Sequence, residues 1–184
     1  MQSAHDRIFE ELVQRYRKTL TAAAYHLCDD WEAAHDLVQD TLLDAYRSLE
    51  SLRDQEKGLA WLYTILRRKA SAYRRLKRQE IELTVEPAVP GPDNVESMVR
   101  GIVIEQMERL TPEEREMLAG KYLLGLSYQE LAEALGITAG AARVRCFRAK
   151  EKLREALSGV AITVPQKTKP VQSLKINGGG QHGV

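Results

Sequence analysis

Apolar residues recur about every three to four positions along most of the chain, a spacing typical of amphipathic α-helices that bury one face. Strict alternation of apolar and polar residues, which would indicate strands, is nearly absent. The pattern predicts helices near residues 5–27, 31–51, 58–79, 95–109, 112–123, 127–135 and 139–157. We therefore expect an all-α protein.

The helical pattern stops at residues 82–95, "ELTVEPAVPGPDNV", an acidic stretch with three prolines and one glycine. Because proline cannot continue a helix, this stretch predicts a flexible linker. It separates one small helical domain, residues 1–81, from a second one, residues 96–158. Residues 159–184 also lack helical periodicity, so we expect a disordered tail there.

The second domain carries clear signals for where helices begin and end. Thr111 with Glu114, and Ser127 with Glu130, each place a capping hydroxyl three residues before an acid. Gly136 fits a helix end in the left-handed conformation. A short turn after this glycine leads into the last helix, so the pattern is that of a helix-turn-helix.

The last helix has two distinct faces. Its apolar face predicts a buried row: Ala142, Cys146, Ala149, Leu153 and Leu157. The opposite face and its flanks combine bases with exposed apolar residues: Arg143, Val144, Arg145, Phe147, Arg148 and Lys150. In the major groove of DNA, arginine can contact guanine edges or phosphates, and apolar atoms can contact thymine methyl groups. The alternative is a charged surface helix whose Phe147 packs on a neighbouring element.

An acidic stripe marks the predicted helix at 31–51, where Asp36, Asp40 and Asp44 recur every four residues. Like charges at this spacing repel each other by a few tenths of a kcal/mol per pair. The stripe is therefore either a solvated face or a docking surface for a basic partner.

A basic segment follows, because residues 59–79 hold seven bases and no acid. Away from the centre of its apolar face, or beside it, lie Arg67, Arg68, Arg74, Arg75 and Arg78. The positive charges of such a helix favour binding to the phosphates of nucleic acid. A basic helix that lies on a membrane surface is a competing interpretation. Trp61 could stack on an unpaired base or belong to the core.

Composition narrows the class of protein further. The two cysteines, Cys28 and Cys146, lie far apart without metal-ligand spacing, which indicates a reducing compartment and no disulfide framework. No segment resembles a signal peptide or a membrane span, so we expect a cytoplasmic protein without direct membrane insertion. The histidines form no ligand set, and the sequence has no glycine-rich phosphate loop and no nucleophile motif. We therefore expect no catalytic residues, metal, cofactor or small-molecule substrate, and no enzyme activity.

The stretch "LTPEEREMLAGKYLLGLSYQELAEALGITAGAARVRCFRAKEKLRE" resembles region 4 of the extracytoplasmic-function (ECF) sigma factors, promoter-specificity subunits of bacterial RNA polymerase. "HDLVQDTLLDAYRSL" is similar to their region 2.2, and "GLAWLYTILRRKASAYRRLKRQE" to regions 2.3 and 2.4. The resemblance implies a region 2 helical bundle and a region 4 helix-turn-helix. It also implies that the recognition-helix residues above bind the −35 promoter element.

The same resemblance assigns the remaining positions. The acidic stripe, with Gln39, would bind the clamp coiled coil of the polymerase β′ subunit, and the β flap is a further expected contact. Arg53, Asp54 and Gln55, in the loop before the basic helix, would read a flipped-out base of the −10 element. The resemblance also implies an anti-sigma factor as a partner. A stand-alone helix-turn-helix regulator remains the alternative, but it would leave the acidic stripe and the basic helix at 58–79 unexplained.

Overall fold

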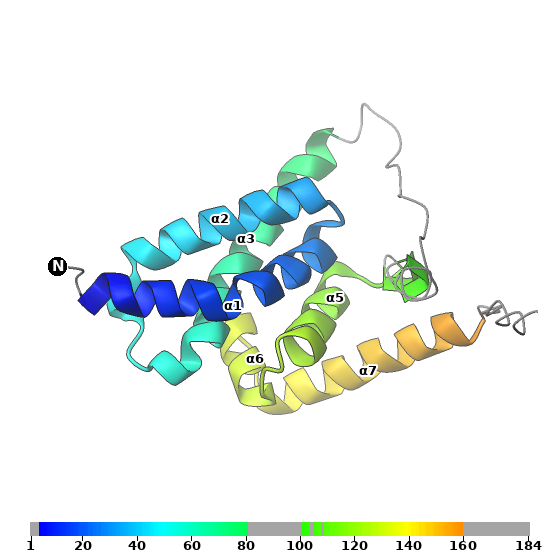
Figure 1. Ribbon diagram of the computed structural model, residues 1–184. Helices are drawn as coiled ribbons and strands as arrows, with labels where there is room; N and C mark the ends of the chain where they lie inside the picture. Colours follow the sequence, from blue (N-terminus) through cyan, green and yellow to red (C-terminus); the bar gives the residue numbers. More distant parts are fainter. Residues whose placement is uncertain (1–3, 81–100, 104, 108, 160–184) are drawn as a thin grey trace, which may run out of the picture.

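The computed structural model describes residues 4–80, 101–103, 105–107 and 109–159 (Figure 1). Within these ranges every regular element is helical, which confirms the predicted all-α class. Helices α1 (Ala4–Cys28), α2 (Trp31–Arg47) and α3 (Gly58–Glu80) form an N-terminal bundle in which each helix packs against the other two. Helices α5 (Pro112–Leu118), α6 (Tyr128–Leu135) and α7 (Ala139–Ser158) form the C-terminal domain.

The N-terminal bundle is built around the apolar stripes of its three helices. Leu20 and Leu27 of α1, Val38 of α2, and Leu62 and Leu66 of α3 are all fully or almost fully buried. The short connection between α1 and α2 is closed by the side chain of Asp30, which accepts hydrogen bonds from the first-turn amides of α2. Capping of this kind stabilises a helix start by about 1 kcal/mol.

The predicted helix at 31–51 is shorter in the structure, because α2 ends at Arg47. The amide of Ser48 bonds to the carbonyls of both Asp44 and Ala45, and its hydroxyl donates to the carbonyl of Asp44. This side-chain bond competes with the helical ladder, and the chain continues as the 3₁₀ turns η1 (Leu49–Ser51) and η2 (Gln55–Lys57). The loop before α3 is therefore a pair of tight turns.

Both capping boxes of the C-terminal domain are present as predicted, at Thr111 with Glu114 and at Ser127 with Glu130. Gly136 ends α6 with a left-handed φ of 67°, which leads into α7. The helix predicted at 112–123 differs in one respect: α5 ends at Leu118, and the chain continues as a π-helical turn, η3 (Ala119–Leu123).

The two domains pack directly against each other. The apolar core of the N-terminal bundle continues without a break into Ala119, Leu124, Leu131 and Ala142 of the C-terminal domain. A smaller cluster, which includes Met107, Met117, Cys146 and Ala149, joins α5 to α7. In Figure 1 the C-terminal end of α7 extends away from the N-terminal bundle.

Several predicted features fall outside the described residues. These are the linker at 82–95, most of the helix at 95–109 and the tail beyond residue 159. Helical segments at 101–103 and 105–107 are described and lie within the predicted helix.

Candidate nucleic-acid interface

Helix α7 presents its predicted recognition face to solvent. Cys146 and Ala149 are fully buried against the rest of the domain, as the apolar periodicity predicted. All six candidate contact residues, Arg143, Val144, Arg145, Phe147, Arg148 and Lys150, are exposed. Phe147 keeps 62% of its surface exposed and Val144 keeps 49%, so within the described residues Phe147 is not packed under a neighbour. Among the described residues, this exposure argues against the alternative in which Phe147 packs on a neighbouring element.

The start of α7 is fixed by local contacts. The Thr138 hydroxyl accepts a hydrogen bond from the amide of Ala141 and so caps the helix. The Arg143 guanidinium lies 5.4 Å from the centre of the Tyr128 ring, and the Lys121 ammonium lies 4.7 Å from it. Cation–π contacts of this kind are worth about 0.5–1 kcal/mol at exposed sites. They orient Arg143 while leaving it exposed.

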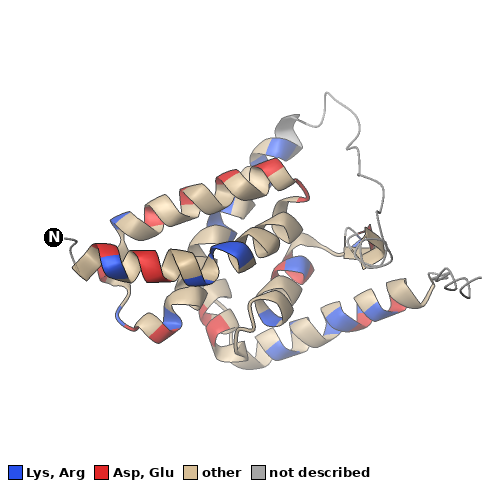
Figure 2. Cartoon of the chain, viewed as in Figure 1, with Lys and Arg blue, Asp and Glu red and all other residues tan. Residues whose placement is uncertain are grey.

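The acidic stripe lies along the outer face of α2, where Figure 2 shows acidic residues spaced along the helix. Asp36, Gln39 and Asp40 are exposed. Asp44 differs, because the ammonium of Lys69 on α3 lies 2.6 Å from its carboxylate and 4.0 Å from that of Asp40. Lys69 thus reaches from α3 to α2 and partly neutralises one end of the stripe.

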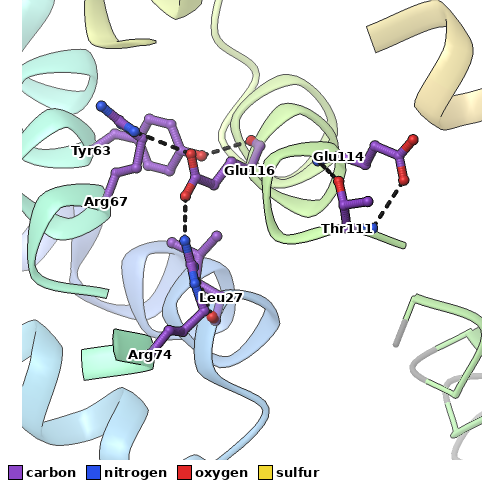
Figure 3. A network of polar contacts seen from close by, with 7 residues as sticks. All are labelled: Leu27, Tyr63, Arg67, Arg74, Thr111, Glu114 and Glu116. Atoms are coloured by element: carbon purple, nitrogen blue, oxygen red, sulfur yellow. Dashed lines mark hydrogen bonds and ion pairs between the residues drawn. The ribbon is translucent and has the colours of Figure 1, made fainter. Parts of the chain in front are cut away.

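The basic residues of α3 divide into two groups. Arg68 and Arg75 are exposed. Arg67 and Arg74 are only 24% and 21% exposed, and both contact the carboxylate of Glu116 on α5 (Figure 3). The side chain of Arg78 lies outside the described residues. Trp61 is partly buried against the core of the bundle.

The loop before α3 holds three exposed candidates, Arg53, Asp54 and Gln55. The carboxylate of Asp54 accepts a hydrogen bond of 2.9 Å from the amide of Glu56 and so caps η2. This hydrogen bond orients the Asp54 side chain, with Arg53 and Gln55 on either side of it in the chain.

Two kinds of site were sought among the described residues, a metal cluster and a membrane span. The described residues contain no cluster of three His, Cys, Asp or Glu side chains suited to a metal, and none of their helices is long and apolar enough to cross a bilayer. Both cysteines are buried, and burial raises the pKa of the Cys28 thiol to about 11. A thiol with so high a pKa is almost entirely protonated near neutral pH and is a weak nucleophile.

Sequence reasoning missed the residue that joins the two domains, Glu116. Its carboxylate is 4% exposed and lies 2.7 Å from an Arg74 nitrogen and 3.3 Å from an Arg67 nitrogen. The Tyr63 hydroxyl donates a 2.7 Å hydrogen bond to the Glu116 carbonyl, and burial raises the Tyr63 pKa above its usual range. Tyr63 is fully buried, so in this arrangement it cannot stack on a base. Four of the seven residues of α5 are charged, so nothing in the sequence singled out Glu116.

The C-terminal domain is a helix-turn-helix with an exposed basic helix. It is attached to a three-helix bundle that has one acidic and one basic face. Together these features define a two-domain DNA-binding protein. Comparison with known families is consistent with this class: "Sigma-70 region 2" matches residues 12–80, and "Sigma-70, region 4" matches residues 100–153. The RNA polymerase sigma factor CarQ of Myxococcus xanthus is 30% identical over 161 residues, which cover 85% of this chain and 92% of CarQ. The chain therefore belongs to the sigma-70 family of RNA polymerase sigma factors, in its extracytoplasmic-function group.

Two further relatives agree with this assignment. The ECF RNA polymerase sigma-E factor of Haemophilus influenzae is 27% identical over 175 residues, which cover 85% of this chain and 91% of that protein. The sigma factor RpoE from Bartonella quintana, solved in complex with the anti-sigma factor NepR, matches 83% of this chain and 98% of its own length. That match has a TM-score of 0.71 at 27% identity.

Proposed function

We propose that this chain binds core RNA polymerase through α2 and directs transcription to promoters by reading two DNA elements. The exposed face of α7 reads the −35 element. The loop at 51–57 and helix α3 open and read the −10 element. The single observation that carries the proposal is the coexistence, in one chain of this family, of an exposed recognition helix and an exposed acidic stripe on a second domain.

The acidic stripe supports polymerase binding rather than a stand-alone regulator. Asp36, Gln39 and Asp40 point to solvent from one face of α2, where a basic partner could approach all three. Leu43, on the same helix, is 54% exposed and would add apolar contact area. A regulator that binds an operator on its own has no use for this surface, and membership of the sigma-70 family also weighs against it.

The proposal includes three further statements. The chain contributes recognition and no reaction of its own, since polymerase supplies the chemistry of transcription. It acts in the cytoplasm, where its polymerase and promoter partners are. An anti-sigma factor holds it inactive, as the resemblance to RpoE in its complex with NepR supports.

Run-off transcription with purified core polymerase and promoter fragments from the same genome tests the proposal. We expect specific transcripts that depend on the chain. Arg148→Ala should weaken promoter binding by about 1–3 kcal/mol if Arg148 contacts a base edge, whereas Arg154→Ala, on the same helix but paired with Glu151, should have little effect. Loss of transcripts with both variants alike would argue against a specific role for Arg148.

The polymerase surface has its own test. Asp40→Ala should lower the affinity for core polymerase without changing binding of the isolated protein to DNA, and Glu11→Ala, an exposed acid on α1, serves as the matched control. If the chain neither binds core polymerase nor starts transcripts, yet shifts duplex DNA alone, it is a stand-alone regulator.

A further inference from the structure

The ring of Tyr128 connects the two helices of the helix-turn-helix. Tyr128 is the first residue of α6 and directly follows the N-cap Ser127, whose capping box fixes this end of the helix. Its side chain is partly buried and packs against both apolar clusters, the large one shared by the two domains and the small one between α5 and α7. Packing on both sides and a capped backbone leave this ring little freedom to move.

Two cations share the Tyr128 ring. The Lys121 ammonium, 4.7 Å from its centre, also donates a hydrogen bond of 2.9 Å to the Leu126 carbonyl. The Arg143 guanidinium carbon lies 5.4 Å from the same centre. Among the described residues Arg143 forms no ion pair and no side-chain hydrogen bond, so the ring is what holds its guanidinium. If the ring is removed, Lys121 keeps a backbone partner and Arg143 does not.

Arg143 differs from the other arginines of the recognition face. It is the fifth residue of α7 and lies nearer to the start of the helix than Arg145 and Arg148. In helix-turn-helix proteins the N-terminal residues of the recognition helix contact the base edges. Neither Arg145 nor Arg148 contacts a ring or a carboxylate among the described residues. The structure therefore orients one arginine of this face, and that arginine is the one best placed for a base.

Orientation matters for an arginine because its side chain has many rotamers. Its fork must also lie in the plane of a guanine edge to donate two hydrogen bonds. A side chain that is already held in one arrangement loses less freedom when it binds. A cation–π contact at an exposed site changes such an equilibrium by about two- to fivefold. This gain applies only at the base pair that the arginine contacts, so it raises discrimination there.

We propose that Tyr128 is a positioning residue for promoter recognition. Its ring holds Arg143 in the orientation in which α7 reads one base pair of the −35 element, and it thereby sets the base preference at that position. This step rests on the function proposed above, since it needs α7 to read DNA. Tyr128 acts through Arg143 and needs no contact with a base. The competing role is purely structural, in which Tyr128 only fills space between the two clusters.

Tyr128→Leu is the main test, because it removes the aromatic face and keeps an apolar side chain against both clusters. Tyr128→Phe is the matched control, because it keeps the ring and loses only the hydroxyl. Each variant is combined with core polymerase in run-off transcription on promoter fragments in which every −35 base pair is replaced in turn. Arg143→Ala identifies the base pair that Arg143 reads. We expect Tyr128→Leu to lower discrimination at that base pair by about two- to fivefold, and Tyr128→Phe to retain it.

A double variant separates positioning from packing. If the ring acts through Arg143, Tyr128→Leu has no further effect on discrimination in an Arg143→Ala background, and it keeps its full effect in an Arg148→Ala background. A structural role instead lowers binding alike for every base pair, and its effect persists without Arg143. Either of those results overturns the proposal, as does an unchanged base preference in a folded Tyr128→Leu chain.

A second variant covers the case in which Tyr128→Leu fails to fold in a thermal-unfolding control. Pentafluorophenylalanine at position 128 nearly keeps the shape of the ring and removes the negative charge of its face. Relative to Tyr128→Phe, it should show the same loss at the same base pair, and an unchanged preference overturns the proposal.

The outcomes also separate this proposal from the proposed function. An unsubstituted chain that starts no transcript overturns the proposed function. The same base preferences, measured on duplex DNA that the chain alone selects from a random pool, then decide the role of Tyr128. A chain that binds no DNA in either form overturns both.

Discussion

Gly120→Ala tests how tightly the domains pack. The glycine lies in η3, and a Cβ at this position would be 2.4 Å from Leu131 Cδ2 and 3.1 Å from Tyr63 Cε1. Leu131 could turn its methyl group away, but it is fully buried and has little room to do so. The Tyr63 ring is held by its hydrogen bond to the Glu116 carbonyl. Both neighbours therefore resist displacement.

The magnitude follows from two opposing contributions. Overpacking a core by a methyl group costs about 1–3 kcal/mol. Replacing glycine by alanine in a helical turn returns up to about 1 kcal/mol. We expect a net destabilisation of about 0–3 kcal/mol. Gly140→Ala is the control, because nothing lies within 4 Å of its added Cβ, and it should stabilise by a few tenths to about 1 kcal/mol.

Thermal or urea unfolding of the two variants side by side measures the difference. We expect Gly120→Ala to be less stable than Gly140→Ala by about 1–3 kcal/mol, or about 3–9 °C in Tm for a chain of this size. Equal stability of the two variants would show that the close approach at Gly120 is absent in solution. That result would refute the packing argument at this interface.

Three other predictions rest on local contacts. Ser127→Ala removes the capping box of α6 and should cost about 1 kcal/mol in thermal unfolding, while Ser127→Asp, which keeps a capping oxygen, should lose less. Burial lowers the pKa of His26, so between that lowered pKa and about 6.5 the unfolded chain binds more protons than the folded one. The free energy of unfolding should be highest above about pH 6.5 and should fall as the pH decreases through that value. His26→Asn should make Tm depend less on pH over this range. Cys28 should not react with Ellman's reagent at neutral pH until the chain unfolds, and fast reaction of the native protein would contradict its burial.

Local signals in the sequence were sufficient for much of the fold. Some helix ends depend only on residues within four positions in the sequence, so the sequence alone can predict them. These are the capping boxes at Ser127 and Thr111 and the end of α6 at Gly136. The burial of Cys146 beside an exposed Phe147 follows from helical periodicity alone. The early end of α2 at Arg47 and the π turn at Gly120 were missed. The first depends on a serine hydroxyl bonding to the backbone, and the second occurs where the chain packs against the other domain.

The contact at Glu116 could not be predicted, since its arginine partners lie 49 and 42 residues away and are brought close only by the packing of two domains. The helix carrying Arg67 and Arg74 has no acid in its central stretch, so the sequence indicated an acceptor from elsewhere and favoured phosphate. In the structure these arginines bind a carboxylate of the same chain, and phosphate binding by this helix stays a prediction. What the sequence left undetermined was whether the acceptor belongs to DNA or to the same chain.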